Sequence, residues 1–385
     1  MLQTIMEFNK TTDSRNARNV LILYDEEKAF IGDSYIMINK LSSCKSYFTL
    51  STIDINSRNK KHATVYGALL KNNPYIRKFS NLPWEDLDFT GYDMILCINR
   101  DEEQLLQLLK KRFDSQASPK IWTTAVYSMS AQMLNNLLGP VNTVFPSLTE
   151  IIDHAMKYAI RQPSQLYISK EEKEDGNRWL KDNGLKEHEH LYIILDSTSS
   201  KGKLLSMDVY YEILQYLLNK EGIKILIFDE QNIGKENFYR EWLGVEKTAR
   251  MIFAKKLGLR YDLCILSSDY TKLVLGPCTG MMHCASGMYN HFVSNGTPAA
   301  SVPHLITYTG EYTNDPAGAY RWWGNSPLVK CLIIRRAAGD AIETVVLNDL
   351  PPEERTAITG ALLCDAYTPE QIISYLPVHR EAMII

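Results

Sequence analysis

The sequence predicts an α/β protein made of two doubly wound domains. Short apolar runs, typical of strands covered on both faces, alternate with amphipathic stretches typical of helices along almost the whole chain. This alternation stops once, at Arg161–Lys170, and then begins again. A chain of 385 residues, 45% of them hydrophobic, is long enough for two cores. We therefore expect a first domain at 1–165, a second at 171–350 and a helical tail at 351–385 that packs back toward the first domain.

Each expected strand is a short apolar run, and each expected helix follows a polar loop. In the first half we expect strands at Val20–Leu23, Tyr47–Ser51, Met94–Cys97, Ile121–Ala125 and Thr143–Phe145, with helices at Glu102–Arg112 and Leu148–Ile160. In the second half we expect strands at Leu191–Leu195, Ile223–Phe228, Lys272–Leu275 and Ala299–Val302, with helices at Asp208–Asn219, Glu353–Leu363 and Pro369–Tyr375. Ligands of such sheets bind beyond the carboxyl ends of the strands, so we look for the site in the loops that follow strands.

Composition and charge exclude several classes of protein. The formal net charge of −3 gives no overall attraction to nucleic acid. No run approaches the roughly 18 apolar residues that span a bilayer, and the N-terminal stretch is too polar for a signal peptide. We therefore expect a cytoplasmic protein with at most peripheral contact with the inner face of the membrane. The seven cysteines include no CxxC pair, so we expect buried thiols rather than disulfides or a zinc site.

The loop after the strand at 191–195 has the composition of an anion-binding loop. It reads Asp-Ser-Thr-Ser-Ser-Lys-Gly-Lys over 196–203. Hydroxyl and backbone N–H groups donate hydrogen bonds to phosphate, and a lysine neutralises its charge. The Walker A pattern is absent. A solvated polar turn explains the same residues equally well.

The loop after Leu275 offers a second anion site. Thr279 and Gly280 present backbone donors at the start of a helix, whose dipole favours a diphosphate. His283 lies in the first turn of that helix, where it contacts a ligand or, slightly favoured from the residues alone, packs as a satisfied histidine. A nucleophilic pair or a metal site built from Cys278, His283 and Cys284 is less favoured, because no further partner or fourth ligand lies at usable spacing.

Acidic residues follow two other strands. Asp33, after Gly32, is either a helix N-cap, which spacing alone favours, or a general base for a hydroxyl nucleophile. Glu230 and Glu236 are alternative acceptors for ribose hydroxyls after the strand at 223–228. A solvated acidic turn is equally plausible there, and spacing does not decide between the two glutamates.

Taken together, these loops resemble glycosyltransferase family nine, the ADP-heptose:lipopolysaccharide heptosyltransferases and their relatives. The matching elements are Ile31-Gly32-Asp33, Asn73-Pro74-Tyr75 before an apolar strand, Tyr92-Asp93 before Met94–Leu96, the Thr198-Ser199 pair with Lys203, and the stretch 278–285. That stretch, Cys-Thr-Gly-Met-Met-His-Cys-Ala, matches the family signature Asp-Thr-Gly-x-x-His-x-Ala at every fixed position except the first. The resemblance implies the GT-B fold, in which two Rossmann-like domains face a central cleft.

The resemblance also implies a reaction. A sugar passes with inversion, without metal or cofactor, from a nucleotide-sugar donor to a hydroxyl of a glycan or lipid-linked glycan acceptor of the lipopolysaccharide type. Asp33 is implied as the general base. Lys203, with Thr198 and Ser199, is implied to hold the diphosphate and stabilise the leaving nucleotide. The implied donor site is completed by Cys278, Thr279, Gly280, Met281 and His283, with Glu230 or Glu236.

Two departures from the family pattern bear on the substrate. Cys278 stands where the signature has Asp, and a thiol is a poor acceptor for sugar hydroxyls, so the donor sugar is left open beyond heptose. Leu204 and Leu205 replace the aromatic residue that commonly follows the lysine, which argues against adenine as the base. Two alternatives remain. One is a nucleotide-sugar epimerase of the same shape. The other is a catalytically silent binding subunit, which Cys278 favours and the retained Asp33, Lys203 and His283 disfavour.

Three other features have two interpretations each. The aromatic stretch around Trp322 and Trp323 either packs in the core or stacks on the nucleotide base. The Asp86-Leu87-Asp88 sequence resembles a metal-binding DxD but lies in a connector, so we interpret it as solvated charge. The basic run 58–62 is either an acceptor site or, favoured, a solvated helix face.

Overall fold

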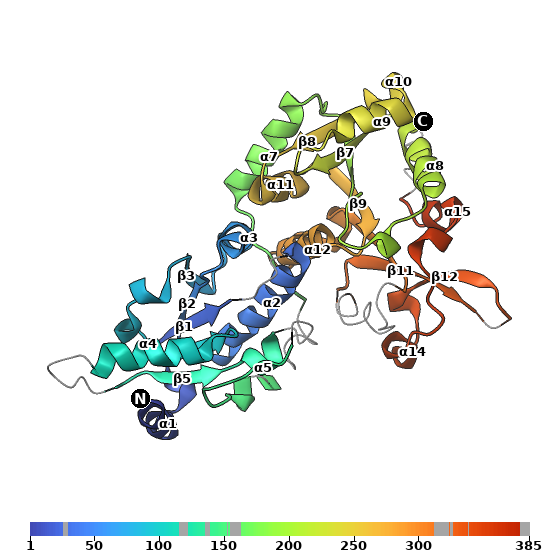
Figure 1. Ribbon diagram of the computed structural model, residues 1–385. Helices are drawn as coiled ribbons and strands as arrows, with labels where there is room; N and C mark the ends of the chain where they lie inside the picture. The colour runs from blue at the N-terminus through green and yellow to red at the C-terminus, as the bar shows by residue number, and fades with distance from the viewer. Residues whose placement is uncertain are drawn as a thin grey trace. The chain divides into compact units, whose positions relative to one another are not determined.

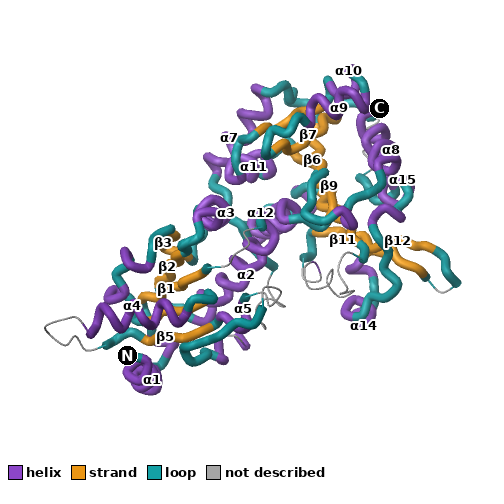
Figure 2. Tube along the Cα trace, viewed as in Figure 1, coloured by secondary structure: helices purple, strands orange, loops and turns teal. Residues whose placement is uncertain are grey.

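The computed structural model describes residues 1–25, 30–114, 122–134, 139–151, 153–154, 163–311, 323, 326–337 and 339–377. Contacts divide the chain into two units, Met1–Gln162 and Pro163–Ile385, and this boundary falls within the expected linker. Each unit has its own sheet with helices packed on it (Figure 1). Figure 2 shows helices and strands alternating along both units. The α/β class predicted from the sequence is confirmed.

The first unit is built on five parallel strands in the order β3-β2-β1-β4-β5. The strands are β1 (Asn19–Tyr24), β2 (Thr52–Asn56), β3 (Ile76–Ser80), β4 (Met94–Ile98) and β5 (Ala125–Ser128). The helices are α1 (Leu2–Thr11), α2 (Ile31–Tyr47), α3 (Lys60–Leu70), α4 (Glu102–Asp114) and α5 (Ser130–Met133), with short 3₁₀ helices η1 (Ser14–Asn16), η2 (Trp84–Asp86) and η3 (Phe89–Gly91). The strand order reverses between β1 and β4, as in doubly wound folds.

A buried carboxylate fixes the loops at the carboxyl edge of this first sheet. Glu102, the first residue of α4, is fully buried. It accepts hydrogen bonds from the hydroxyls of Ser128 and Ser130 and from the backbone N–H groups of Val144 and Phe145. Charge-assisted bonds of this kind offset the cost of burying the carboxylate. Leu105 and Leu109 of the same helix are buried in one apolar cluster with side chains of β1 and β4.

The second unit is built on seven strands in the order β12-β11-β10-β9-β6-β7-β8, all pairs parallel except β11 with β12. The strands are β6 (His190–Ile194), β7 (Ile223–Asp229), β8 (Met251–Lys255), β9 (Thr271–Pro277), β10 (His304–Thr309), β11 (Val329–Arg336) and β12 (Ile342–Val346). The helices are α7 (Lys170–Asp182), α8 (Met207–Leu218), α9 (Lys235–Leu243), α10 (Val245–Thr248), α11 (Leu259–Leu266), α12 (Gly280–Ser294), α14 (Pro352–Thr356) and α15 (Pro369–Ile373). Short 3₁₀ helices are η5 (Lys201–Lys203), η6 (Ala299–Ser301), η7 (Leu347–Asp349) and η8 (Cys364–Ala366).

The tail packs differently from our expectation. We expected 351–385 to return toward the first domain. Instead, Cys364, Tyr367, Ile372 and Leu376 are buried in the core of the second unit, and α15 lies beside α8 (Figure 1). Burial of these apolar side chains in one cluster with residues of α8 and of the second sheet stabilises the tail in this position. Residues 378–385 lie outside the described residues.

Several expected elements are shifted, each for a local reason. The strand expected at Tyr47–Ser51 is the end of α2 and a turn, and β2 follows it. The apolar pattern did not predict β2 because the buried Asp54 interrupts it. The segment Ala299–Val302 begins with η6 because Pro303, which lacks an N–H, delays the strand to His304. The helix expected at Glu353–Leu363 ends at Thr356. The strand expected at Thr143–Phe145 is a loop. Helix 148–160 is described only to residue 154.

All seven cysteines are buried and carry free thiols. Cys44 and Cys97 lie in the first unit, and the other five lie in the second, at positions 264, 278, 284, 331 and 364. Burial raises the pKa of the Cys44 thiol to about 12. These thiols act as small apolar side chains, as predicted from the sequence.

Candidate donor-binding site

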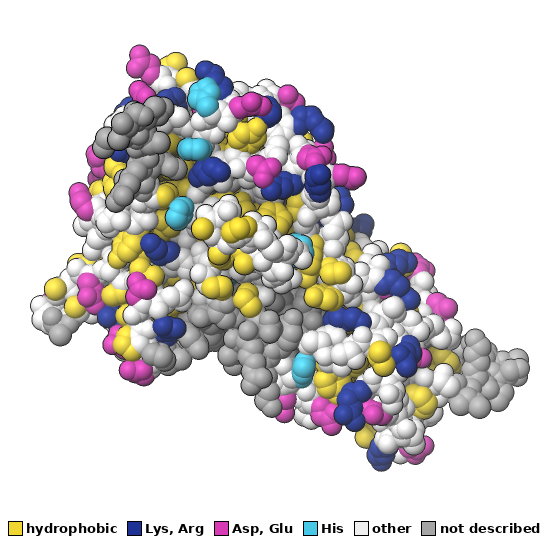
Figure 3. Space-filling model, turned by 180° about the vertical axis from the view of Figure 1, so that it is seen from behind, with side chains coloured by type: hydrophobic (Ala, Val, Ile, Leu, Met, Phe, Trp, Pro, Cys, Tyr) yellow, Lys and Arg dark blue, Asp and Glu magenta, His cyan; other side chains and the backbone are white. Residues whose placement is uncertain are grey.

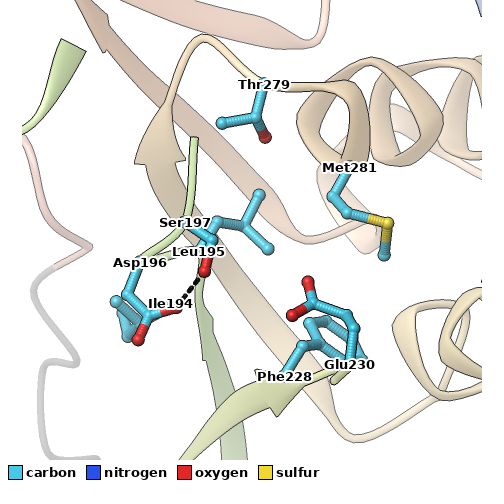
Figure 4. Close-up of a pocket in the computed structure, with 8 residues that line it drawn as sticks. All are labelled: Ile194, Leu195, Asp196, Ser197, Phe228, Glu230, Thr279 and Met281. Atoms are coloured by element: carbon cyan, nitrogen blue, oxygen red, sulfur yellow. Dashed lines mark hydrogen bonds between the residues drawn. The ribbon is translucent and has the colours of Figure 1, made fainter. Parts of the chain in front are cut away.

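A pocket opens at the carboxyl edge of the second sheet, where the strand order reverses between β6 and β9. Its volume is about 220 Å³, part of it open to solvent. The lining residues follow three neighbouring strands and are Ile194, Leu195, Asp196, Ser197, Phe228, Glu230, Thr279 and Met281. Figure 4 shows the Glu230 and Thr279 side chains directed into the pocket, whereas the Ser197 hydroxyl donates to Asp196. In doubly wound folds this switch point is where ligands bind.

Gly276 allows the loops after β6 and β9 to approach each other. A Cβ atom at this position would lie 2.5 Å from Leu195 Cβ and 2.7 Å from the Leu195 carbonyl oxygen. Neither distance is compatible with a side chain. The glycine is therefore required for the two loops to share one pocket.

The start of α12 presents backbone donors at the pocket. Thr279 is the N-cap, and its hydroxyl accepts a bond from the Met282 N–H at 3.5 Å. Gly280 begins the helix, Thr279 and Gly280 are partly exposed, and Met281 lines the pocket. The first-turn N–H groups of a helix have no helical partners, and the helix dipole adds positive potential there. This end of α12 can therefore bind an anion.

Lys203 adds a cation at the same place. Its Nζ donates to the carbonyl oxygen of Cys278 at 3.3 Å, just before α12. Burial, together with the charge of Lys203, lowers the pKa of His283 to about 3, so this imidazole is neutral at neutral pH. The structure thus brings Lys203, Cys278 and His283 together. Burial raises the pKa of Cys284 strongly, which leaves it a thiol and argues against a nucleophilic Cys–His pair there.

The two candidate glutamates lie in different surroundings. Glu230 lines the pocket, whereas Glu236 pairs with Arg240 and Lys255 on the surface of α9 and β8. The turn between them is held by the buried Asp229, which accepts the backbone N–H groups of residues 233, 234 and 235. Of the two, only Glu230 is placed to contact a ligand in this pocket.

An ion pair that sequence reasoning missed joins the loops after β6 and β7. Lys235 Nζ lies 2.6 Å from Asp196 Oδ1 and also donates to the Ser197 hydroxyl and the Phe228 carbonyl oxygen. The Tyr239 hydroxyl donates to Asp196 Oδ2 at 2.9 Å. Both charged side chains are largely buried. The sequence signal for this pair is Gly234-Lys235, at the start of the helix after the second strand of the unit.

A second missed residue is Asp262, in the first turn of α11. Its side chain is buried, and its Oδ1 has no hydrogen-bond partner among the described residues. Burial, and then the nearby charge of Glu230, raises the pKa of this carboxyl to about 7. An acid beside the pocket therefore holds its proton up to neutral pH.

Three other residues expected in the site do not line the described pocket. Thr198 and Ser199 follow Ser197 but do not line the pocket. Asp33 is the third residue of α2, whose N-cap is Phe30, so the N-cap interpretation of Asp33 is wrong. The Asp33 side chain lies outside the described part of the structure.

The proposed stacking of Trp323 on a nucleotide base is also wrong. Trp323 is buried, and its indole stacks on the imidazole of His283 with ring centroids 4.2 Å apart and planes inclined by 6°. No face is left open for a base. Trp322 lies outside the described residues.

Arg58, from the basic run 58–62, is engaged within the first unit. It forms ion pairs with Asp25 at 2.7 Å and Asp101 at 2.6 Å, and its guanidinium lies 3.6 Å from the Trp84 ring centroid. Asn59 caps α3. Lys and Arg side chains are interspersed with Asp and Glu over the face shown in Figure 3. Arg58 is therefore a structural cation rather than an open anion site.

Two features are absent from the part of the chain that the structure describes. No group of three His, Cys, Asp or Glu side chains there is arranged to hold a metal ion. Within those same residues, no helix combines the length and apolar character needed to cross a bilayer. Asp86 ends η2 and Asp88 caps η3, accepting the Thr90 N–H, as solvated connector residues do.

Comparison with known proteins identifies the fold of this chain. No protein-family model and no curated protein sequence matches the chain. The structure of Escherichia coli ADP-heptose lipopolysaccharide heptosyltransferase II matches 92% of this chain and 96% of its own, with a TM-score of 0.55 and 15% identity. The structure of a family 9 glycosyl transferase from Veillonella parvula matches 82% of this chain and 84% of its own, with a TM-score of 0.49 and 11% identity. E. coli heptosyltransferase WaaC with ADP matches 77% of this chain and 89% of its own, with a TM-score of 0.44 and 13% identity. Both TM-scores lie below 0.5, so neither match supports a further argument. The chain has the GT-B fold expected from its motifs.

Proposed function

We propose that this chain is an inverting glycosyltransferase that needs no metal and moves a sugar from a nucleotide-sugar to a hydroxyl of a glycan or lipopolysaccharide-type acceptor. One observation carries the proposal. The N-terminus of α12 and the Glu230 side chain line one pocket at the strand switch point of the second unit, and the Lys203 ammonium donates to the carbonyl oxygen of Cys278, just before α12. A nucleoside diphosphate has the complementary groups, an anionic diphosphate and a hydroxyl-bearing ribose. The GT-B fold supports the same assignment by analogy.

The donor would be held by groups of fixed charge. Lys203 and the first-turn N–H groups of α12 offset the diphosphate charge and stabilise the leaving nucleotide, which is the role a metal has in other transferases. Glu230 would accept hydrogen bonds from ribose hydroxyls. The apolar side chains of Phe228 and Met281 line the remaining wall. The enclosed part of the pocket measures only about 20 Å³, so the pocket would hold only part of the donor.

The acceptor side of the proposal rests on Asp33. Its place in the first turn of α2, just after β1, puts its backbone at the carboxyl edge of the first sheet. A carboxylate there would take the proton of the acceptor hydroxyl as that hydroxyl attacks the anomeric carbon. The breaking bond releases the nucleoside diphosphate toward Lys203. We place this reaction in the cytoplasm, at most at the inner face of the membrane.

Donor binding is tested by thermal shift with ADP, GDP, UDP and dTDP, because a ligand that binds only the folded state raises the melting temperature. Lys203→Ala should weaken the nucleotide affinity about tenfold to a hundredfold, the value of one charge-assisted hydrogen bond. Lys201→Ala is the matched control, because Lys201 is an exposed lysine of the same η5 turn. Equal affinities for the two variants would contradict the assigned diphosphate site.

The reaction itself is tested by product analysis with and without acceptor glycans. A transferase releases nucleoside diphosphate and forms a new glycosidic bond only when acceptor is present. An epimerase would instead convert the donor alone, and a silent subunit would bind nucleotide without turnover. Asp33→Asn should bind donor normally and lose transfer. Retained transfer by this variant would refute the base assignment.

A further inference from the structure

The ammonium of Lys235 contacts three residues that line the donor pocket, and these contacts use all of its N–H groups. Its Nζ donates to Asp196 Oδ1 at 2.6 Å, to the Ser197 hydroxyl at 2.7 Å and to the Phe228 carbonyl oxygen at 2.6 Å. An ammonium has three donors, so none is left for a phosphate or a sugar. Lys235 can therefore act on a bound ligand only through its neighbours.

The helix that carries Lys235 is fixed to the same pocket. Lys235 is the first residue of α9, and the buried Asp229 accepts its backbone N–H at 3.1 Å. One turn later, the Tyr239 hydroxyl donates to Asp196 Oδ2 at 2.9 Å. Burial, and then the charge of Asp196, raises the pKa of Tyr239, so the phenol keeps its proton and remains a donor. Both oxygens of the Asp196 carboxylate are thus occupied by side chains of α9.

Glu230 is the other carboxylate of the pocket, and its oxygens are differently placed. Its side chain is directed into the pocket (Figure 4), and no described residue donates a hydrogen bond to it. Glu230 Oε2 lies 3.9 Å from Lys235 Nζ, too far for a hydrogen bond but close enough for electrostatic attraction. Because three other bonds hold the ammonium in place, it attracts Glu230 without occupying its oxygens. Glu230 therefore keeps its acceptors for a ligand.

We propose that Lys235 is a positioning residue through which the donor site selects ribose over 2′-deoxyribose. It occupies the carboxylate of Asp196 and holds that of Glu230 at the pocket with its oxygens open. This inference rests on the proposed function and specifies the sugar of the nucleotide. Ribose offers two neighbouring hydroxyls to one carboxylate, whereas 2′-deoxyribose offers one. A site built to bond a hydroxyl rejects the analogue that lacks it, because an acceptor is then left without a donor.

Loss of the ammonium would affect the two carboxylates differently. Asp196 and Glu230 would become two uncompensated anions in one pocket and would repel each other. Asp196 would stay bonded to Tyr239, so Glu230, whose side chain is 42% exposed, would turn toward solvent. The preference for ribose would then disappear. If Lys235 instead bound the diphosphate directly, its loss would weaken ribonucleotides and 2′-deoxyribonucleotides equally.

The test compares the affinities of ADP, GDP and UDP with those of their 2′-deoxy analogues. In the wild type, each ribonucleotide that binds should exceed its analogue by about tenfold or more, the value of one charge-assisted hydrogen bond. Lys235→Met keeps the length of the side chain and removes its charge, so it should bring this ratio close to one. Lys255→Met is the matched control, because Lys255 pairs with Glu236 outside the pocket. This control should keep the wild-type ratio.

An unchanged ratio in Lys235→Met overturns the inference, even if both affinities fall together. Equal binding of both sugars by the wild type also overturns it, and both results leave the proposed function standing. If Lys235→Met does not fold, Asp196→Asn replaces it. The ammonium then loses its anionic partner and moves to the Glu230 oxygens, so the ratio must fall or the inference fails. Binding of none of the nucleotides by the wild type refutes the proposed function, and the inference with it.

Discussion

Replacing Asp262 with Asn should remove most of the pH dependence that this residue gives to the stability of the second unit. Asp262 is 2% exposed, its Oδ1 has no partner among the described residues, and its carboxyl pKa is raised from 3.8 to about 7. The folded state therefore holds this proton more tightly than the unfolded state does. The stability that Asp262 provides is complete below about pH 4 and is lost as the pH rises through 7.

The magnitude follows from the size of the pKa shift. One pKa unit corresponds to about 1.36 kcal/mol, so a shift of about three units costs on the order of 4 kcal/mol above pH 7. Because the cost has only partly developed at pH 5, where it is roughly 1.5 kcal/mol, it grows by about 2–3 kcal/mol between pH 5 and pH 8. Asn has nearly the same shape and does not titrate. Its own burial cost is the same at both pH values.

The assay measures the free energy of unfolding of both proteins at pH 5 and pH 8, from hydrogen exchange in peptides of α11 and β9. The stability of Asp262→Asn relative to wild type should rise by about 2–3 kcal/mol from pH 5 to pH 8. His283, whose lowered pKa acts in the opposite direction, cancels in this difference. Asp208→Asn, at an exposed acid in the first turn of α8, is the control. Parallel stability curves for wild type and Asp262→Asn would refute the reasoning.

Two further predictions concern residues that fix the loops at the carboxyl edges of the two sheets. Gly276→Ala should destabilise the second unit by more than about 2 kcal/mol, because its Cβ would overlap Leu195, whereas Gly67→Ala, which meets open space in α3, should be neutral or stabilising in thermal unfolding. Equal melting temperatures for the two variants would contradict the close approach of the loops. Glu102→Gln should cost about 2–4 kcal/mol in the first unit, measured by hydrogen exchange in β5, because an amide cannot accept all four bonds that the carboxylate accepts. Unchanged exchange in β5 would show that those bonds contribute little.

The sequence predicted those parts of the fold that follow from apolar periodicity. The strands β1, β4, β6, β7 and β9 were expected within two residues of their bounds, since each is a continuous buried run. β2 was misplaced because Asp54 interrupts its apolar pattern. The ion pair of this residue with Arg77 and its bond from the Tyr92 hydroxyl depend on partners more than twenty residues away in the sequence. Long-range pairing of this kind is not visible in a local pattern.

The candidate site was predictable where a motif fixed the backbone and not where burial decided the chemistry. Thr279 at the N-cap follows from a strand, a glycine and a helix start, whereas the contact of Lys203 with Cys278 joins residues 75 positions apart and was not expected. The sequence did not decide between Glu230 and Glu236, because the ion pair of Glu236 with Lys255 is visible only in the structure. The state of Asp262 and the partner of Trp323 depend on three-dimensional packing, so neither was expected.

The distribution of thiols makes the two units separately observable. A thiol-specific reagent reacts slowly with the folded chain, because every cysteine is enclosed. Opening of the first unit would expose two reactive sulfurs, and opening of the second would expose five. The mass added to each molecule during labelling therefore identifies which half has opened, and a bound nucleotide should protect the set of five alone.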